Sequence, residues 1–233
     1  MDRVKIQKPG TFSVYVSADT RRAEFDCKNE VIVTNRVPVD FVFIGDSITE
    51  MWELNAYFRK NKLILNRGIG GDRTEYLLKR FEADVIQPKP EYAILMIGVN
   101  DASELEDDPW TGKKGGSPES ITETIIKNIT SMLELASGHG QKMILCSILP
   151  TNMTFSPKNM ERNKVILQVN HSLRQIAKAR ELIYVDYHSH LVKEDGLTMK
   201  DGLTLEGLHP HVYGYDIMAE VLRKELRDNH IEI

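Results

Sequence analysis

Two residues have the types that a serine hydrolase needs, and each follows a glycine in a short polar segment. Ser47 lies in Gly-Asp-Ser-Ile (45–48), and His209 lies in Glu-Gly-Leu-His-Pro (206–210). A serine hydroxyl becomes an effective nucleophile when a base such as histidine takes its proton. Each segment alone also has an ordinary explanation, because Asp and Ser cap helices and many loop histidines are simply solvated. The acyl-transfer interpretation therefore depends on further segments.

Two other segments carry hydrogen-bond donors. Residues 66–72 read Asn-Arg-Gly-Ile-Gly-Gly-Asp, and residues 98–101 read Gly-Val-Asn-Asp. Glycines let a backbone approach a ligand and direct its N–H groups outward, and an asparagine amide can donate into a site or cap a helix. The glycine spacing is not the G-x-G-x-x-G of dinucleotide binding, which leaves a nucleotide-binding protein as a weaker alternative. Together the four segments supply a nucleophile, a base and oxyanion donors.

The elements that must position these segments are short apolar runs alternating with amphipathic stretches. The runs are 41–44, 63–65, 93–97, 143–145 and 182–185. Each run is continuously apolar, as expected for strands of a parallel sheet covered on both faces. Helices are predicted from Pro118 to Gly138 behind a Ser117 N-cap, from about 159 to 180, and from about 214 to 227. This alternation predicts an α/β fold with right-handed crossovers and a ligand site at the carboxyl ends of the strands, where the four segments fall.

Residues 1 to about 40 do not follow this alternation. Phe12, Val14, Val16 and Ala18 alternate with polar neighbours, and a second apolar run occupies 31–33. We interpret residues 1–40 as a short β extension of one or two strands packed on a main domain of residues 41–233. A length of 233 residues suits one large domain.

Composition restricts the classes of partner. The net charge of −4 argues against a general nucleic-acid binder, and no stretch approaches the length of an apolar membrane span. The N-terminus lacks the apolar segment of a signal peptide, so a cytoplasmic location is expected, although a secreted chain trimmed of its leader would look the same. With only two cysteines, no disulfide framework is expected, and Cys146 lies in an apolar run as a small buried hydrophobe.

The four segments, taken in order, resemble the SGNH hydrolases, also called the GDSL family of esterases and lipases. The matching blocks are Gly45–Ile48, Gly68–Asp72, Gly98–Asp101 and Gly207–Pro210, within a resemblance that spans residues 41 to about 225. The resemblance implies a three-layer α/β/α sandwich with a flavodoxin-like, five-stranded parallel sheet. It also implies an oxyanion hole made from the N–H of Ser47, the N–H of Gly71 and the side-chain amide of Asn100.

The third member of the triad departs from the family pattern. The family normally has aspartate three residues before the histidine, and this sequence has Glu206. Glutamate carries the same charge and can also accept a hydrogen bond from the histidine Nδ1–H, as in serine hydrolases of other folds. We predict Glu206 as the orienting acid, with Asp201 or a backbone carbonyl as alternatives. A catalytically silent binding module is the rival that this departure favours.

The resemblance further implies a substrate with a short acyl chain and no cofactor. We expect a small-molecule ester, with an acetylated carbohydrate preferred over an acyl thioester or a lysophospholipid. Trp52, Trp110 and Phe155 lie in or near loops at the predicted active edge and are candidates for an acyl or sugar pocket, with the alternative that Trp52 belongs to the core. The pairs His188/His190 and His209/His211 invite a metal interpretation, but no third ligand is evident, so no metal is expected.

Overall fold

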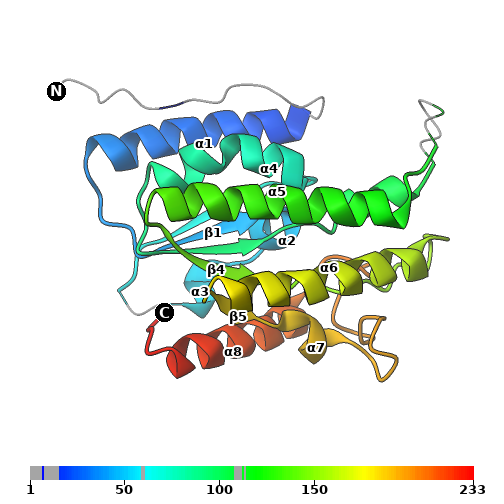
Figure 1. Ribbon diagram of the computed structural model, residues 1–233. Helices are drawn as coiled ribbons and strands as arrows, with labels where there is room; N and C mark the ends of the chain where they lie inside the picture. Colours follow the sequence, from blue (N-terminus) through cyan, green and yellow to red (C-terminus); the bar gives the residue numbers. More distant parts are fainter. Residues whose placement is uncertain (1–6, 8–15, 59–60, 108–111, 113) are drawn as a thin grey trace. The chain divides into compact units, whose positions relative to one another are not determined.

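The computed structural model describes residues 7, 16–58, 61–107, 112 and 114–233 of the chain (Figure 1). Its strands form a five-stranded sheet in the order β2-β1-β3-β4-β5. Each strand overlaps one of the apolar runs that the sequence marked as a strand, although β2 continues past its run to Gly68. The strands are β1 (Phe41–Gly45), β2 (Ile64–Gly68), β3 (Tyr92–Met96), β4 (Lys142–Cys146) and β5 (Ile183–Val185).

Helices connect the strands. The three long helices predicted from the sequence are confirmed as α5, α6 and α8, and Ser117 precedes α5 with its hydroxyl accepting from the Ser120 N–H at 3.2 Å. The helical segments are α1 (Val16–Thr34), α2 (Ser47–Glu50), α3 (Leu54–Tyr57), α4 (Thr74–Phe81), the π-helix η1 (Glu82–Ile86), the 3-10 helix η2 (Asp101–Leu105), α5 (Pro118–Gly138), α6 (Asn159–Ala179), α7 (Tyr187–Leu191) and α8 (Val212–Asp228).

The sheet has the doubly wound order of flavodoxin-like folds. Strand β1 pairs in parallel with β2 and with β3, so that Gly45 lies opposite Gly68 on one side and Met96 on the other. All five residues of β1 are buried, which explains its uninterrupted apolar sequence. The expected three-layer α/β/α fold class with a parallel sheet is confirmed, and its carboxyl edge is where such folds bind ligands.

The predicted N-terminal β extension is contradicted between Val16 and Thr34, whereas Phe12 and Val14 lie outside the described residues. Residues Val16–Thr34 form helix α1, and the apolar run 31–33 belongs to its last turns. The buried positions Arg22, Phe25 and Asn29 recur at helical spacing, but two of the three are polar. A hydrophobic pattern therefore does not reveal this buried face of the helix.

Contacts within the chain gather into two compact units, which we describe separately. The first unit comprises Met1–Ile97 and Asn128–Ile144, and the second comprises Gly98–Lys127 and Leu145–Ile233. In the first unit α1 packs against η1, and in the second α7 packs against α8. The division of the sequence at residue 41 into extension and domain stays a prediction.

The two cysteines have different environments. Cys146 is buried at the end of β4, and burial raises the pKa of its thiol to about 12, against the lowering effect of a hydrogen bond with Tyr187. Cys27 is exposed on α1. Among the helices in the described part of the chain, none combines the length and the apolar character needed to cross a membrane.

Candidate active site

Ser47 is the first residue of helix α2 and follows β1 after a single intervening residue. That residue, Asp46, caps the helix, because its side chain accepts a hydrogen bond from the Ile48 N–H at 3.0 Å. The Ser47 residue is only 6 % exposed. A strand and a capped turn therefore fix the position of the predicted nucleophile.

The segment around Ser47 is packed against its neighbours at backbone contact distance. A Cβ at Gly68 would lie 2.1 Å from the Glu50 nitrogen, and a Cβ at Gly45 would lie 2.3 Å from the Met96 carbonyl oxygen. Asn66 also links α2 to β2, because its amide donates to the Thr49 carbonyl at 2.8 Å and its oxygen accepts from the Gly68 N–H at 2.9 Å. Helix α2 and strand β2 are thus in such close contact that a side chain at Gly68 would clash with the backbone.

The glycine segment after β2 forms a tight turn beside Ser47. The Asp72 N–H donates to the Ile69 carbonyl at 3.1 Å, and Gly71 has a φ of +75°, as residue i+2 of a type II turn requires. A Cβ at Gly70 would lie 3.9 Å from the Ser47 Cβ. Within the described part of the chain, no protein acceptor takes the Gly71 N–H. The turn therefore has an amide N–H to offer a ligand, close to the serine.

A buried guanidinium ties the ends of β1 and β2 to this turn. Arg80, in α4, donates to the Gly45 carbonyl at 3.0 Å, to the Arg67 carbonyl at 2.9 Å and to the Asp72 carboxylate at 2.7 Å. It also donates to Asp84 at 2.8 Å. Burial acts to lower the pKa of Arg80, but the two carboxylates outweigh it and hold that pKa above its usual value.

Removing this guanidinium is expected to cost far more stability than removing an exposed one. Arg80→Met removes a buried cation that pairs with both Asp72 and Asp84, so we expect a loss of about 3–5 kcal/mol in the free energy of unfolding. Arg223→Met removes an exposed partner of Glu220 and is the matched control, with an expected loss below about 1 kcal/mol. Urea unfolding of both variants measures the difference, and equal losses would contradict the role assigned to Arg80.

In the second unit, the His209 segment is a closed loop fixed by its own backbone. The Leu205 N–H donates to the His209 carbonyl at 3.0 Å, and the Gly207 N–H donates to the Thr204 hydroxyl at 3.0 Å. Gly207 has a φ of +94°, and a Cβ there would lie 2.2 Å from the Asn152 carbonyl oxygen. Glycine at position 207 therefore satisfies both the turn and the contact with the loop after β4.

Glu206 contacts the imidazole that it was predicted to orient. Its Oε1 is hydrogen-bonded to the Nδ1 of His209 and also accepts from the His209 N–H at 3.3 Å. Asp201, the alternative acid, instead accepts from the Asn152 amide at 2.8 Å and pairs with Lys193 at 2.8 Å. A carboxylate on Nδ1 favours the tautomer that leaves Nε2 to act as the base. Glutamate in place of the family's aspartate had favoured a catalytically silent binding module. In the structure this glutamate, Glu206, forms a hydrogen-bonded pair with His209.

Asn100 is the N-cap residue of the 3-10 helix η2 in the second unit. Its carbonyl accepts from the N–H of Ser103 at 3.2 Å and from the Ser103 hydroxyl at 2.6 Å. Gly98, two residues earlier, has a φ of +132°, and a Cβ there would lie 2.5 Å from Ile148 Cδ1. The backbone that carries Asn100 is therefore fixed by its own helix and by packing.

The predicted substrate-binding residues have different environments. Trp52 is buried, and its ring packs against those of Phe43, Tyr57 and Phe58, which favours the core alternative for this residue. Phe155 is 69 % exposed on a loop of the second unit. Trp110 lies outside the described residues. Contacts of these side chains with a substrate stay predictions.

The histidines that invited a metal interpretation lie in different environments. His188 is buried in α7, and burial lowers the pKa of its imidazole against the raising effect of Asp186. His211 caps α8, accepting from the Tyr213 N–H at 3.3 Å. Among the residues described, no three His, Cys, Asp or Glu side chains are grouped as metal ligands would be.

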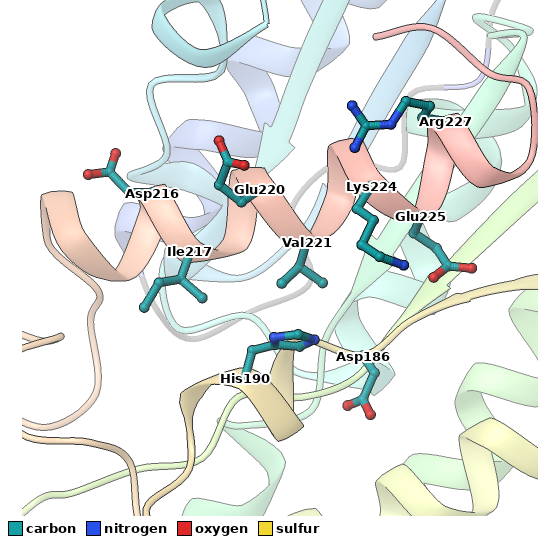
Figure 2. Close-up of a pocket in the computed structure, with 9 residues that line it drawn as sticks. All are labelled: Asp186, His190, Asp216, Ile217, Glu220, Val221, Lys224, Glu225 and Arg227. Atoms are coloured by element: carbon teal, nitrogen blue, oxygen red, sulfur yellow. The ribbon is translucent and has the colours of Figure 1, made fainter.

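A separate pocket of about 530 Å³ lies between α7 and α8 in the second unit (Figure 2). His190 of α7 faces Ile217 and Val221 of α8, and charged side chains surround these apolar contacts. None of the predicted catalytic residues lines it. This pocket is thus not built from the residues expected to carry the chemistry.

Sequence reasoning missed the residues that organise the site. Arg80 and Glu50 read as ordinary helix surface charges, and Asn66 reads as a strand end. The available signal for Arg80 was its position beside Leu77 and Phe81 on the apolar face of α4, with an aspartate four residues later.

Comparison with known proteins places the chain in a family. The profile of the GDSL-like Lipase/Acylhydrolase family matches residues 43–217, and the chain belongs to this family. The crystal structure of a GDSL-like lipase from Bacteroides thetaiotaomicron is similar, with 26 % identity and a TM-score of 0.75 over 89 % of this chain and 97 % of the other. The protein is therefore a carboxylic ester hydrolase of the GDSL type.

Two curated relatives add detail. The uncharacterized lipoprotein YqeF of Bacillus subtilis is 30 % identical over 67 % of this chain and 74 % of its own length. The acetylxylan esterase of Geobacillus stearothermophilus is 24 % identical over 70 % of this chain and 71 % of its own length. The cytoplasmic location expected from the sequence stays a prediction.

Proposed function

We propose that this hydrolase is a serine esterase, with Ser47 as nucleophile and His209 as general base. His209 takes the Ser47 proton as the hydroxyl oxygen attacks the ester carbonyl. The tetrahedral intermediate collapses to an acyl-enzyme, and His209 gives the proton to the departing alcohol. Water then attacks the acyl-enzyme by the same route, releasing the carboxylic acid and restoring Ser47.

The observation that carries this proposal lies within the first unit. The predicted nucleophile and a glycine turn with an unused amide N–H are built side by side: a Cβ at Gly70 would be 3.9 Å from the Ser47 Cβ. Preformed amide donors beside a nucleophile are what an oxyanion needs, because they stabilise the charge without reorganisation. In the second unit, the contact of Glu206 with His209 Nδ1 supplies an oriented base.

We further propose that the oxyanion is held by the N–H groups of Ser47 and Gly71 and by the side-chain amide of Asn100. Asn100 follows β3 by four residues, and β3 pairs directly with the strand that ends before Ser47. In flavodoxin-like sheets, the loops after these two neighbouring strands border the ligand site. Removal of one such donor typically lowers kcat by about 10²–10³-fold.

The substrate we propose is a short acyl ester, with acetyl groups on carbohydrates preferred. The acetylxylan esterase among the relatives supports this preference. Phe155, exposed on its loop, and Trp110 are assigned to substrate contact in this proposal, whereas Trp52 is assigned to the core. Acyl thioesters and lysophospholipids are the alternative substrates of the same site.

A fluorophosphonate label tests the nucleophile, and an acyl panel tests the substrate. Mass spectrometry of the labelled and digested protein is expected to place the adduct on Ser47, and an adduct elsewhere or none would overturn the mechanism. Initial rates on p-nitrophenyl esters from acetate to dodecanoate, and on acetylated xylo-oligosaccharides, are expected to be highest for acetyl. A maximum at long chains, or on acyl thioesters, would overturn the substrate assignment and leave the mechanism intact.

A further inference from the structure

We propose that Glu50 is a positioning residue for the oxyanion hole, and that helix α1 supports it through Arg21. In this assignment Glu50 fixes the glycine turn that presents the Gly71 N–H, and it does not contact the substrate. The inference rests on the proposed function, because it gives a role to the oxyanion donors of a Ser47 esterase.

The primary contact joins the helix that begins with the nucleophile to the glycine turn. Glu50 is the last residue of α2, three positions after Ser47, and its Oε2 accepts a hydrogen bond from the Gly70 N–H at 2.5 Å. A Cβ at Gly70 would lie 3.1 Å from the same oxygen. The carboxylate therefore sits directly on the residue that precedes the proposed oxyanion donor.

The other carboxylate oxygen faces helix α1. Arg21 Nε lies 3.6 Å from Glu50 Oε1, and the two side chains are 31 % and 32 % exposed. The Arg21 guanidinium also lies 5.0 Å from the centre of the Phe25 ring, which is buried in the same unit. Helix α1 ends before residue 43, where the family match begins, so this support comes from outside the matched segment.

These contacts account for the orientation of the Gly70–Gly71 peptide. Two consecutive glycines populate many backbone conformations, including those that would turn the Gly71 N–H away. The hydrogen bond from Asp72 N–H to the Ile69 carbonyl closes the turn, and Glu50 fixes the Gly70 N–H at its near end. Oxyanion donors act through preorganisation, and displacement of a reacting group by about 1 Å can lower the rate about 10²-fold.

The test compares two substitutions of similar length. Glu50→Gln keeps an oxygen that can accept from the Gly70 N–H, and Glu50→Met does not. We expect Glu50→Met to lower kcat for p-nitrophenyl acetate by about 10–100-fold with KM nearly unchanged, since an oxyanion contact acts only in the transition state. Glu50→Gln is expected to stay within about fivefold of the wild type. Concentrations of active enzyme are set by titration with fluorophosphonate, so that misfolded protein does not count.

Two variants of helix α1 distinguish an effect on kcat through Glu50 from an effect on the stability of the protein. Arg21→Met removes the cation but leaves the Gly70 hydrogen bond, and is expected to lower kcat by less than about fivefold, as for a partly exposed ion pair. Glu24→Gln removes the other carboxylate near Arg21, 3.6 Å away, and is expected to leave kcat unchanged. Thermal unfolding of all four variants is measured alongside.

The outcomes distinguish this inference from the proposed function. Labelling of Ser47 with an unchanged kcat in Glu50→Met would overturn the positioning role and leave the serine mechanism standing. Equal losses in Glu50→Gln and Glu50→Met would show that the charge matters rather than the acceptor, which also overturns it. Absence of label on Ser47 in the wild type would remove the mechanism itself. If Glu50→Met does not fold, Glu50→Ala provides the same comparison with a shorter side chain.

Discussion

Replacement of Ser47 by alanine is expected to lower kcat for p-nitrophenyl acetate by about 10⁴–10⁶-fold, with the folded structure retained. The hydroxyl is the only group that the proposed mechanism gives to attack on the carbonyl, so no acyl-enzyme can form without it. Ser47 is nearly buried and follows a capped turn whose contacts come from Asp46 and the backbone, so alanine is tolerated sterically. Steady-state kinetics and fluorophosphonate labelling on the same samples measure the effect.

The control for this substitution is a serine whose loss removes no proposed chemistry. Ser172 is in α6, where its exposed hydroxyl donates only to the Gln168 carbonyl of the preceding turn, at 3.2 Å. Ser172→Ala is expected to keep the wild-type kcat and the wild-type label. Substantial turnover by Ser47→Ala, beyond what contaminating esterases in a mock purification produce, would refute the nucleophile.

The second large effect is expected from Glu206→Gln. An amide at this position can present its NH₂ group to Nδ1 and so favour the tautomer in which Nε2 carries the proton and cannot act as the base. A comparable aspartate-to-asparagine change in a serine protease triad lowers kcat by about 10⁴-fold, and we expect a loss of about 10²–10⁴-fold for this half-exposed glutamate. The measurement is kcat for p-nitrophenyl acetate at pH 7–8.

Asp201→Asn is the matched control for Glu206→Gln. Asp201 is also a carboxylate near the histidine in sequence, but its contacts are with Asn152 and Lys193. Its substitution is expected to change kcat by less than about twofold. A reversed result, with the large loss at position 201, would transfer the orienting role to Asp201.

Strand β1 could be predicted because burial on both faces leaves no polar interruption, whereas the apolar run marked only the first two residues of β2, before Asn66 and Arg67. All five residues of β1 are buried, and such a run is visible in any sequence. Helix α1 could not be predicted on the same basis. Its buried face contains Arg22 and Asn29, and the Asn29 side-chain oxygen accepts from the Arg67 guanidinium at 2.7 Å. A local hydrophobic pattern assigns polar residues such as Asn29 to the surface. In the fold, Asn29 is buried because Arg67, far away in the sequence, supplies its hydrogen-bond donor.

The residues proposed for the candidate site are chosen because the chemistry restricts their types, and their roles stay predictions, whereas the residues that hold them in place could not be predicted. Ser47 and His209 are proposed because four short segments occur together in the order that is typical of one enzyme family. Glu50 is the acceptor for the Gly70 N–H, and Arg80 is the side chain that donates to the Gly45 carbonyl. Many other charged residues of the chain resemble these two in sequence. Only coordinates distinguish a charge that faces a backbone amide from one that faces water.

The contrast between the two thiols makes this chain convenient for site-directed chemistry. Because only thiolates react with maleimides, Cys146 is protected by its burial and by its raised pKa, while Cys27 is open to the reagent. A fluorophore can therefore be attached at one defined point of helix α1 without any mutation. Such a dye sits six residues from Arg21, and its emission offers an optical report on the helix that we assign to support the oxyanion turn.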